Sequence, residues 1–145
     1  MAQTQEPEKS SSPCNCLNLR RAALSMTKLY DDYLVPSGLT VSQFSLLKYV
    51  KFLGPLSVSE LADKIRLDRT TLVRNLLPLE DAGFIVDVSA PGTRGRALEL
   101  TKRGVEKYEE AEKLWNNAQD YVGQALGKDD LEQLTSLLTR VENLN

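Results

Sequence analysis

Thr70, Thr71 and Arg74 are side chains that could recognise a nucleic acid, and they lie close together in the sequence. The helix predicted after Asp68 repeats leucines at helical spacing, at Leu72, Leu76 and Leu79. With these leucines turned toward a core, Thr70 and Arg74 point nearly opposite. A helix in the major groove needs short side chains near its N-terminus and a long donor, since arginine pairs bidentately with guanine. The alternative is an ordinary amphipathic helix with a solvated polar face.

Three further arginines, Arg69, Arg94 and Arg96, add positive charge around this helix. Arg69 projects closer to the core side, so we expect it to reach a phosphate. Arg94 and Arg96 lie in the glycine-containing loop Thr93-Arg94-Gly95-Arg96. On a hairpin tip, a guanidinium can enter a narrow minor groove, where the potential is most negative, or bind a phosphate. The alternative is that arginines on such a tip only improve solubility.

Cys14 and Cys16 are the only cysteines, and Arg20 and Arg21 follow them closely. A helix N-terminus and nearby guanidinium groups stabilise a thiolate, so either cysteine could react with peroxide or an electrophile. Alternatively, pairs from two protomers could bind Cu(I) or Zn through four thiolates, or the cysteines could be ordinary thiols. The chain has no histidine, so any metal site would need thiolates and carboxylates only. We assign no metal site and no cofactor.

The elements that hold these side chains can be predicted from caps and apolar spacing. A first helix covers about residues 17–35. Thr40 with Gln43, and Ser57 with Glu60, have the spacing of capping boxes that begin the second and third helices. Asp68 caps the fourth helix, within which Pro78 lacks a donor and Leu77 faces outward. Either the helix bends at Pro78, or Leu77 covers a neighbouring element.

Past the fourth helix, the pattern changes to two short strands and then two more helices. Gly83 supplies a turn of positive φ, and strands at 84–88 and 97–100 flank the loop 89–96. A long helix begins at Thr101 and breaks near Gly127. The run Asp129-Asp130-Leu131-Glu132 is predicted to cap the last helix, whose Leu131, Leu134, Leu138 and Val141 repeat as in a coiled-coil seam. The fold class is therefore mostly α with a small β-hairpin wing: a winged helix-turn-helix.

Length and composition restrict the class of protein. At 145 residues the chain is most simply one globular domain. No apolar run reaches the roughly 18 residues of a membrane span, and the polar start resembles no signal peptide. Two cysteines at i and i+2 cannot form a disulfide framework, so we expect the reducing environment of the cytoplasm. From Lys51 to Arg103 there are nine Lys/Arg against seven Asp/Glu, leaving nine against thirteen elsewhere. The predicted DNA module is thus mildly basic and the remainder acidic. No nucleophile–base pair or phosphate loop indicates an enzyme.

From about Leu17 to its C-terminus, the chain resembles the MarR family of transcriptional regulators. Five segments carry the resemblance: GLTVSQF from Gly38, LSVSELA from Leu56, LDRTTLVR from Leu67, LEDAGFI from Leu79 and RALELTKRG from Arg96. The resemblance implies a homodimer that binds a pseudo-palindromic operator and represses genes until a ligand or oxidant releases it. It assigns DNA contacts to Thr70, Thr71 and Arg74 and to Arg94 in the wing. Many members place an acidic residue beside the wing arginine, whereas Gly92-Thr93 and Gly95 stand here, so the choice between Arg94 and Arg96 stays open.

The resemblance and the apolar helices together predict a division of the chain. Residues 1–13 form a disordered arm, 14–39 and 101–145 a helical dimerisation region, and 40–100 the winged helix-turn-helix. A thin winged domain cannot bury the apolar residues of the terminal helices, so we expect a partner copy to cover them. These are Leu17, Leu24, Tyr108, Trp115 and the leucines from Leu131 to Leu144. A monomeric helical subdomain is the alternative.

Two functions therefore compete. The first is a homodimeric, sequence-specific DNA-binding repressor, released by an apolar or aromatic small molecule between the winged domain and the dimer helices, or by oxidation of cysteine. The second is a winged-helix protein-interaction module without DNA binding. Sequence preference and a steep salt dependence of DNA binding would distinguish the first from the second.

Overall fold

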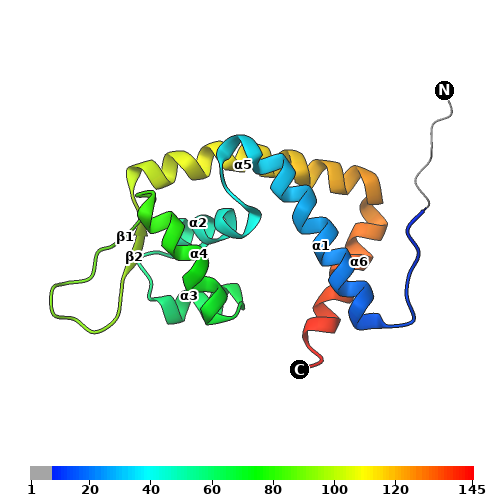
Figure 1. Ribbon diagram of the computed structural model, residues 1–145, viewed down its shortest axis with the longest axis horizontal. Helices are drawn as coiled ribbons and strands as arrows, with labels where there is room; N and C mark the ends of the chain where they lie inside the picture. The colour runs from blue at the N-terminus through cyan, green and yellow to red at the C-terminus, as the bar shows by residue number, and fades with distance from the viewer. Residues whose placement is uncertain (1–7) are drawn as a thin grey trace.

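Helices make up most of the chain, and one β-hairpin interrupts them (Figure 1). The structure is a computed structural model that describes residues 8–145. In chain order the elements are α1 (Asn15–Leu34), η1 (Val35–Ser37), α2 (Val41–Leu53), α3 (Val58–Ile65), α4 (Arg69–Asp81), β1 (Ile85–Asp87), β2 (Leu98–Leu100), α5 (Lys102–Leu126) and α6 (Lys128–Glu142). This is the mostly helical fold with a small wing that the sequence predicts.

The elements form two regions joined by α5. Figure 1 shows α2, α3, α4 and the wing at one end, α1 and α6 at the other, and α5 running along the top of both. The first seven residues of the predicted arm lie outside the described residues. Residues 8–13 form no helix or strand, and Ser12 is tied to α1 because its N–H donates to Asn18 Oδ1 at 2.8 Å.

Side-chain caps begin the helices of the winged unit. Thr40 and Gln43 form the predicted capping box, with bonds of 3.2 and 3.0 Å between each side chain and the other residue's N–H. Asp68 accepts from the Thr71 N–H at 3.1 Å, as predicted. Ser57 accepts from the Glu60 N–H at 3.0 Å, but the described chain lacks the return bond from Glu60. Only half of that predicted box forms.

A glycine follows the end of α4, and one predicted helix start is wrong. Gly83 has a φ of 78° after α4, which a residue with a Cβ adopts only at a cost. The last helix begins one residue before the predicted cap: Gly127 is its N-cap and makes no side-chain bond. Asp129 and Asp130 lie inside the first turn, where their charges still favour the positive end of the helix dipole.

The wing is a short antiparallel hairpin attached to the helical core. Its register pairs Ile85 with Leu100 and Asp87 with Leu98. Leu56, just before α3, adds a third extended segment, because its N–H and carbonyl bond to Leu98 at 3.2 and 2.8 Å. Ile85 and Leu98 are buried with the leucines of α4, so the hairpin and α4 share one core.

Two aromatic residues that the sequence assigned to a partner copy pack against α2 within the chain. Tyr108 of α5 is buried and stacks on Phe44 of α2, with ring centroids 5.5 Å apart. Trp115 is only partly buried, and its ring centroid lies 5.6 Å from that of Phe44. The prediction that Tyr108 needs a partner is therefore wrong, since α2 supplies the ring that covers it, whereas for Trp115 it stays a prediction.

Other apolar residues of the terminal helices stay uncovered. Leu24 of α1 is 73% exposed, and α6 has no buried residue. The exposed apolar residues of α6 and the segment after it are Leu134, Leu137, Leu138, Val141 and Leu144. The described chain thus leaves most of the predicted α6 seam in contact with solvent.

Candidate nucleic-acid interface

Thr70 and Arg74 lie on the side of α4 that faces away from the core. Leu72, Leu76 and Leu79 are buried, and the predicted contact residues Arg69, Thr70, Thr71 and Arg74 are exposed. The helical projection is confirmed for the core leucines. Arg69 is also exposed at the first position of the helix, where its guanidinium can extend beside the N-terminus.

The two threonines differ in their hydrogen bonds. The Thr71 hydroxyl donates to Asp68 Oδ2 at 3.3 Å, beside the bond from its own N–H to the same oxygen. Asn75 Nδ2 donates to the Thr71 carbonyl at 3.1 Å. Thr71 therefore takes part in the cap of α4, whereas the Thr70 hydroxyl makes no hydrogen bond within residues 8–145. Of the two, Thr70 is the one whose hydroxyl is available to a ligand.

Two apolar side chains lie on the same exposed side of α4. Val73 is 40% exposed and Leu77 is 52% exposed. The helix continues through Pro78 to Asp81, so Pro78 does not end it. Leu77 is not part of the buried core, in agreement with the outward direction predicted from the helical projection. Val73 was not singled out by the sequence, although its spacing from Thr70 and Leu77 could have identified it.

The wing tip is a tight turn that leaves Arg94 projecting. Gly92 and Gly95 have φ values of 82° and 87°, which favour glycine. Between them, the Thr93 hydroxyl and N–H both bond to the Ala90 carbonyl and close the turn. No carboxylate within the described chain lies within 4.0 Å of the Arg94 guanidinium. Its charge is therefore directed to solvent.

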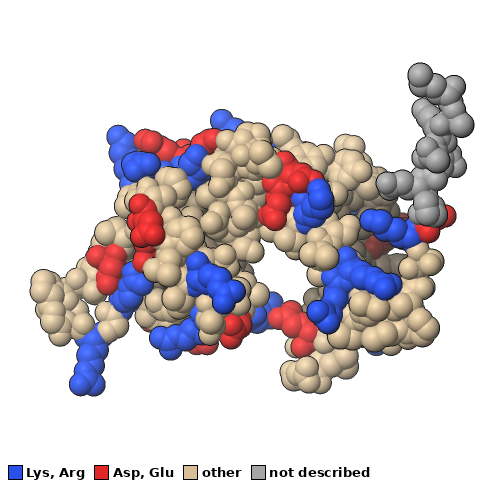
Figure 2. Space-filling model, in the orientation of Figure 1, with Lys and Arg blue, Asp and Glu red and all other residues tan. Residues whose placement is uncertain are grey.

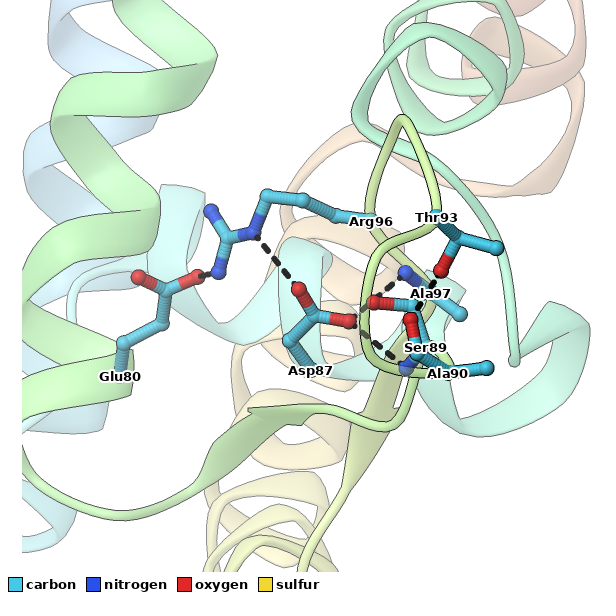
Figure 3. Close-up of polar contacts among 7 residues, drawn as sticks. All are labelled: Glu80, Asp87, Ser89, Ala90, Thr93, Arg96 and Ala97. Carbon is cyan, nitrogen blue, oxygen red and sulfur yellow. Dashed lines mark hydrogen bonds and ion pairs between the residues drawn. The ribbon is translucent and has the colours of Figure 1, made fainter.

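Arg96, in contrast, is held between two carboxylates (Figure 3). Its Nη2 bonds to Glu80 Oε1 in the last turn of α4, and its Nε lies 3.6 Å from Asp87 Oδ2 at the end of β1. Arg96 therefore connects the base of the wing to α4. Glu80 and Asp87 were not identified from the sequence, because each is distant from Arg96 along the chain.

Asp87 also fixes the backbone of the loop. Its Oδ1 accepts from the Ser89 N–H at 2.9 Å and from the Ala97 N–H at 3.0 Å. The bonds from Ser89 and Ala97, with the positive charge of Arg96, lower the pKa of Asp87 from 3.8 to about 2. Because the pKa is lowered, the stabilisation by these bonds is present above pH 3.8 and lost as the pH falls toward 2. At neutral pH the carboxylate that orders the wing is ionised.

Positive side chains extend over the wing and the lower edge of α3 and α4. Figure 2 shows Lys and Arg at the wing tip and along that edge, with a few Asp and Glu between them. This agrees with the small excess of nine Lys/Arg over seven Asp/Glu between Lys51 and Arg103. Helix α4, with its exposed arginine and the cationic hairpin beside it, has the shape and charge to contact a duplex groove and its phosphates.

Comparison with known proteins assigns the chain to a family. The sequence model of the MarR family matches residues 39–87, which include α2, α3, α4 and β1. The crystal structure of the Mycobacterium tuberculosis transcriptional regulator MosR is 32% identical. The match covers 92% of this chain and 98% of MosR, with a TM-score of 0.77. The chain belongs to the MarR family.

Other MarR-family proteins show the same fold in different bound states. MosR in complex with DNA is 33% identical with a TM-score of 0.76, over 89% of this chain and 96% of that one. The transcriptional repressor CouR bound to p-coumaroyl-CoA is 26% identical with a TM-score of 0.82, over 91% and 94%. A transcriptional regulator of Bacillus subtilis, YwoH, is 28% identical over 63% of this chain and 67% of its own. These relatives are regulators of transcription, in agreement with the prediction that this chain is not an enzyme.

Both cysteines of this MarR-family chain are exposed at the start of α1. Cys14 is the N-cap, and its Sγ accepts from the Leu17 N–H at 3.4 Å. Cys16 lies in the first turn. Among residues 8–145, no three histidine, cysteine or acidic side chains gather as a metal site would require. Nor does any helix in that range have the length and apolar character to cross a membrane.

An opening separates the winged unit from α1 and α6. It is visible in Figure 2 between the two regions and lies where the sequence predicts an effector. Across the two regions, Arg66 at the C-cap of α3 pairs with Glu142 at the end of α6, with 3.0 Å between Nε and Oε1. A second hollow, of about 940 Å³, lies between residues 9–11 and α1, outside the predicted effector region.

Proposed function

We propose that this MarR-family regulator is a homodimer that binds a pseudo-palindromic operator and represses transcription in the cytoplasm. The observation that carries the proposal is the exposed pair Thr70 and Arg74 on α4, with Arg94 on a wing attached to the same helix. A recognition helix supplies base contacts in the major groove, and a wing arginine supplies a contact in the minor groove or to phosphate. The DNA complex of MosR, at 33% identity, supports this interpretation.

Each predicted contact residue receives a role from its surroundings. Arg74 reads a guanine, Thr70 makes a short-range base contact, and Arg69 binds phosphate. Arg94, rather than Arg96, enters the minor groove, because Arg96 is neutralised by Glu80 and Asp87. Thr71 approaches the DNA through its methyl group while its hydroxyl caps the helix.

A titration with DNA tests the function. Duplexes selected from a random pool by the purified protein should bind better than scrambled ones, with affinity falling steeply as salt rises. Arg74→Ala should cost about 1–3 kcal/mol and relax the preference at one base position. Arg140→Ala, on the polar side of α6, is the matched control and should bind as the parent does. Equal binding of selected and scrambled duplexes would instead favour the protein-interaction module.

A small apolar or aromatic effector in the opening between the two regions is one proposed release signal. Such a molecule would bind where the winged unit and the α1–α6 region meet, and so could shift the spacing between the recognition helices. The Arg66–Glu142 pair spans these regions, so occupancy that separates them would break it. The CouR complex with p-coumaroyl-CoA supports effector binding within this fold.

Oxidation at Cys14 or Cys16 is the alternative signal. With hydrogen peroxide as oxidant, a thiolate sulfur attacks one peroxide oxygen, the O–O bond breaks, and a sulfenic acid and hydroxide form. Because Cys14 caps α1, its modification would disturb the start of a helix in the predicted dimerisation region. We expect peroxide to release the parent protein from DNA but not the Cys14→Ser, Cys16→Ser double variant. Equal release of both proteins would exclude the cysteines as sensors.

A further inference from the structure

Thr70, Val73 and Leu77 form an apolar stripe along the exposed side of α4. They follow at i, i+3 and i+7, the spacing that places side chains on one side of a helix. Val73 and Leu77 are 40% and 52% exposed, and Thr70 contributes its methyl group. Arg74 lies beside this stripe. The four side chains together make a surface that is apolar along one edge and cationic along the other.

This stripe is not explained by the fold of the chain. The core side of α4 is already filled by Leu72, Leu76 and Leu79, which are all buried. Leu77 is not part of the buried core, and Val73 stabilises α4 less than alanine would, because branching at Cβ restricts its rotamers. A polar residue at either position would serve a solvated helix face equally well. The exposed methyl groups beside Arg74 are therefore available to a ligand.

The chemistry of the neighbouring residues indicates which ligand. Arg69 and Arg74 on the same helix and Arg94 on the wing make this side attractive to a polyanion. In the major groove of DNA, the C5-methyl group of thymine is the apolar feature that side chains can contact, and it lies beside the guanine atoms that arginine reads. Valine is suited to this contact because its branched side chain holds its methyl groups in one rotamer.

We propose that Val73 and Leu77 determine specificity by contacting thymine C5-methyl groups in each operator half-site, next to the guanine that Arg74 reads. This inference rests on the proposed function and extends it to two residues that carry no hydrogen-bonding group. It requires that thymines lie next to the guanine that Arg74 contacts. That guanine is the base whose replacement reduces the effect of Arg74→Ala on binding. Thr70 can also donate a hydrogen bond through its hydroxyl, so the proposal assigns the methyl contact to Val73 and Leu77 alone.

Replacement of thymine by deoxyuracil tests the contact, since it removes only the methyl group. In the selected duplex, each thymine is replaced singly and the dissociation constant is measured at one salt concentration. We expect about fourfold weaker binding at one or two positions, equivalent to about 0.8 kcal/mol for each buried methyl. Val73→Ala or Leu77→Ala should weaken binding to the thymine duplex by a similar factor and remove the difference between thymine and deoxyuracil at its own position.

The controls separate this inference from the proposed function. Val35→Ala, a change of the same kind at an exposed residue of η1, should keep the full thymine dependence. If selected duplexes bind specifically but no thymine methyl matters, the inference fails and the regulator stands. A methyl effect that persists unchanged in both Val73→Ala and Leu77→Ala would also overturn it, because DNA shape or another residue would then be responsible. Loss of all sequence preference in the parent would instead refute the proposed function.

Discussion

Arg94 and Arg96 are separated by a single glycine, yet their surroundings give them different capacities. Arg96 is paired with Glu80 and Asp87, so much of its charge is already compensated within the protein. An arginine so placed orders the wing by joining it to α4. Arg94 projects from a turn closed by Thr93 and keeps its charge for a ligand. One residue is suited to bind DNA and the other to position the element that carries it.

We predict that Arg94→Ala and Arg96→Ala weaken DNA binding in distinguishable ways. Arg94→Ala should reduce the slope of log affinity against log salt by about 1, because one phosphate-region contact is lost, and leave the free protein unchanged. Arg96→Ala should increase amide hydrogen exchange in residues 88–97 of the free protein before any DNA is added. If Arg96→Ala changes the salt slope while exchange in the wing stays as in the parent, Arg96 is itself a DNA ligand.

At the scale of elements, the wing depends on how closely α5 approaches the turn between α4 and β1. The Thr101 N–H donates to the Phe84 carbonyl at 3.0 Å, and the Thr101 hydroxyl donates to the Gly83 carbonyl at 2.6 Å. Gly104 follows in the first turn of α5. A Cβ added there would lie 2.1 Å from the Phe84 carbonyl oxygen, and the obstacle is backbone. Only glycine allows α5 to pack this closely against the turn.

We therefore predict that Gly104→Ala destabilises the protein by about 1–3 kcal/mol, because α5 and the turn at Phe84 must separate to admit the methyl group. Gly123→Ala is the matched control, since it lies in the same helix and its Cβ would meet nothing within 4 Å. That change should stabilise the protein by about 0.5–1 kcal/mol, the gain for alanine over glycine in a helix interior. Urea unfolding of both variants measures the difference. If Gly104→Ala were as stable as Gly123→Ala, α5 would be able to shift away from Phe84 without a cost in free energy.

The elements that the sequence predicted well are those determined by neighbouring residues. Thr40 with Gln43, Asp68 and Gly83 each act within a few residues of their own position, so their spacing indicates the helix ends directly. The prediction that Asp129 caps the last helix was wrong because acidic residues are favourable both at the N-cap and in the first turn. The N-cap is Gly127. The sequence did not indicate that α3 ends at Arg66, since the left-handed φ of 56° at this residue is a conformation typical of glycine or asparagine.

For the candidate site, the sequence predicted the exposed side of α4 but not what surrounds it. Helical period alone places Thr70 and Arg74 opposite the core leucines. The pairing of Arg96 with Glu80 and Asp87 depends on the tertiary approach of α4 to the wing, which spacing does not encode. The same limit explains why Tyr108 was assigned to a partner: nothing local indicates that Phe44 would cover it.

At the scale of the whole molecule, α6 is the element that the chain itself leaves incomplete. Its apolar residues line one side of the helix, and none of its residues is buried. Leu24 of α1 is likewise exposed, and Figure 1 shows α1 and α6 at the end of the molecule opposite the wing. A second copy related by a two-fold axis would cover these faces mutually. It would also place two recognition helices about one turn of duplex apart, roughly 34 Å.

We predict that Leu138→Glu converts the protein to a folded monomer. A carboxylate at this position, 45% exposed in the single chain, would become buried without a partner charge in the dimer. Ser136→Glu adds the same charge on the opposite side of α6 and should leave the dimer intact. Sedimentation equilibrium gives the mass, and circular dichroism confirms that helices remain.

Loss of the dimer should affect DNA binding far more than loss of any one contact. A dimer binds its second half-site at a high effective concentration, so a monomer should bind the operator about 100-fold more weakly or worse. Its affinity for a single half-site should stay close to that of the parent, because α4 and the wing are unchanged. A Leu138→Glu protein that sediments as a dimer would show that α6 is not the interface, and the exposed leucines would then need another explanation.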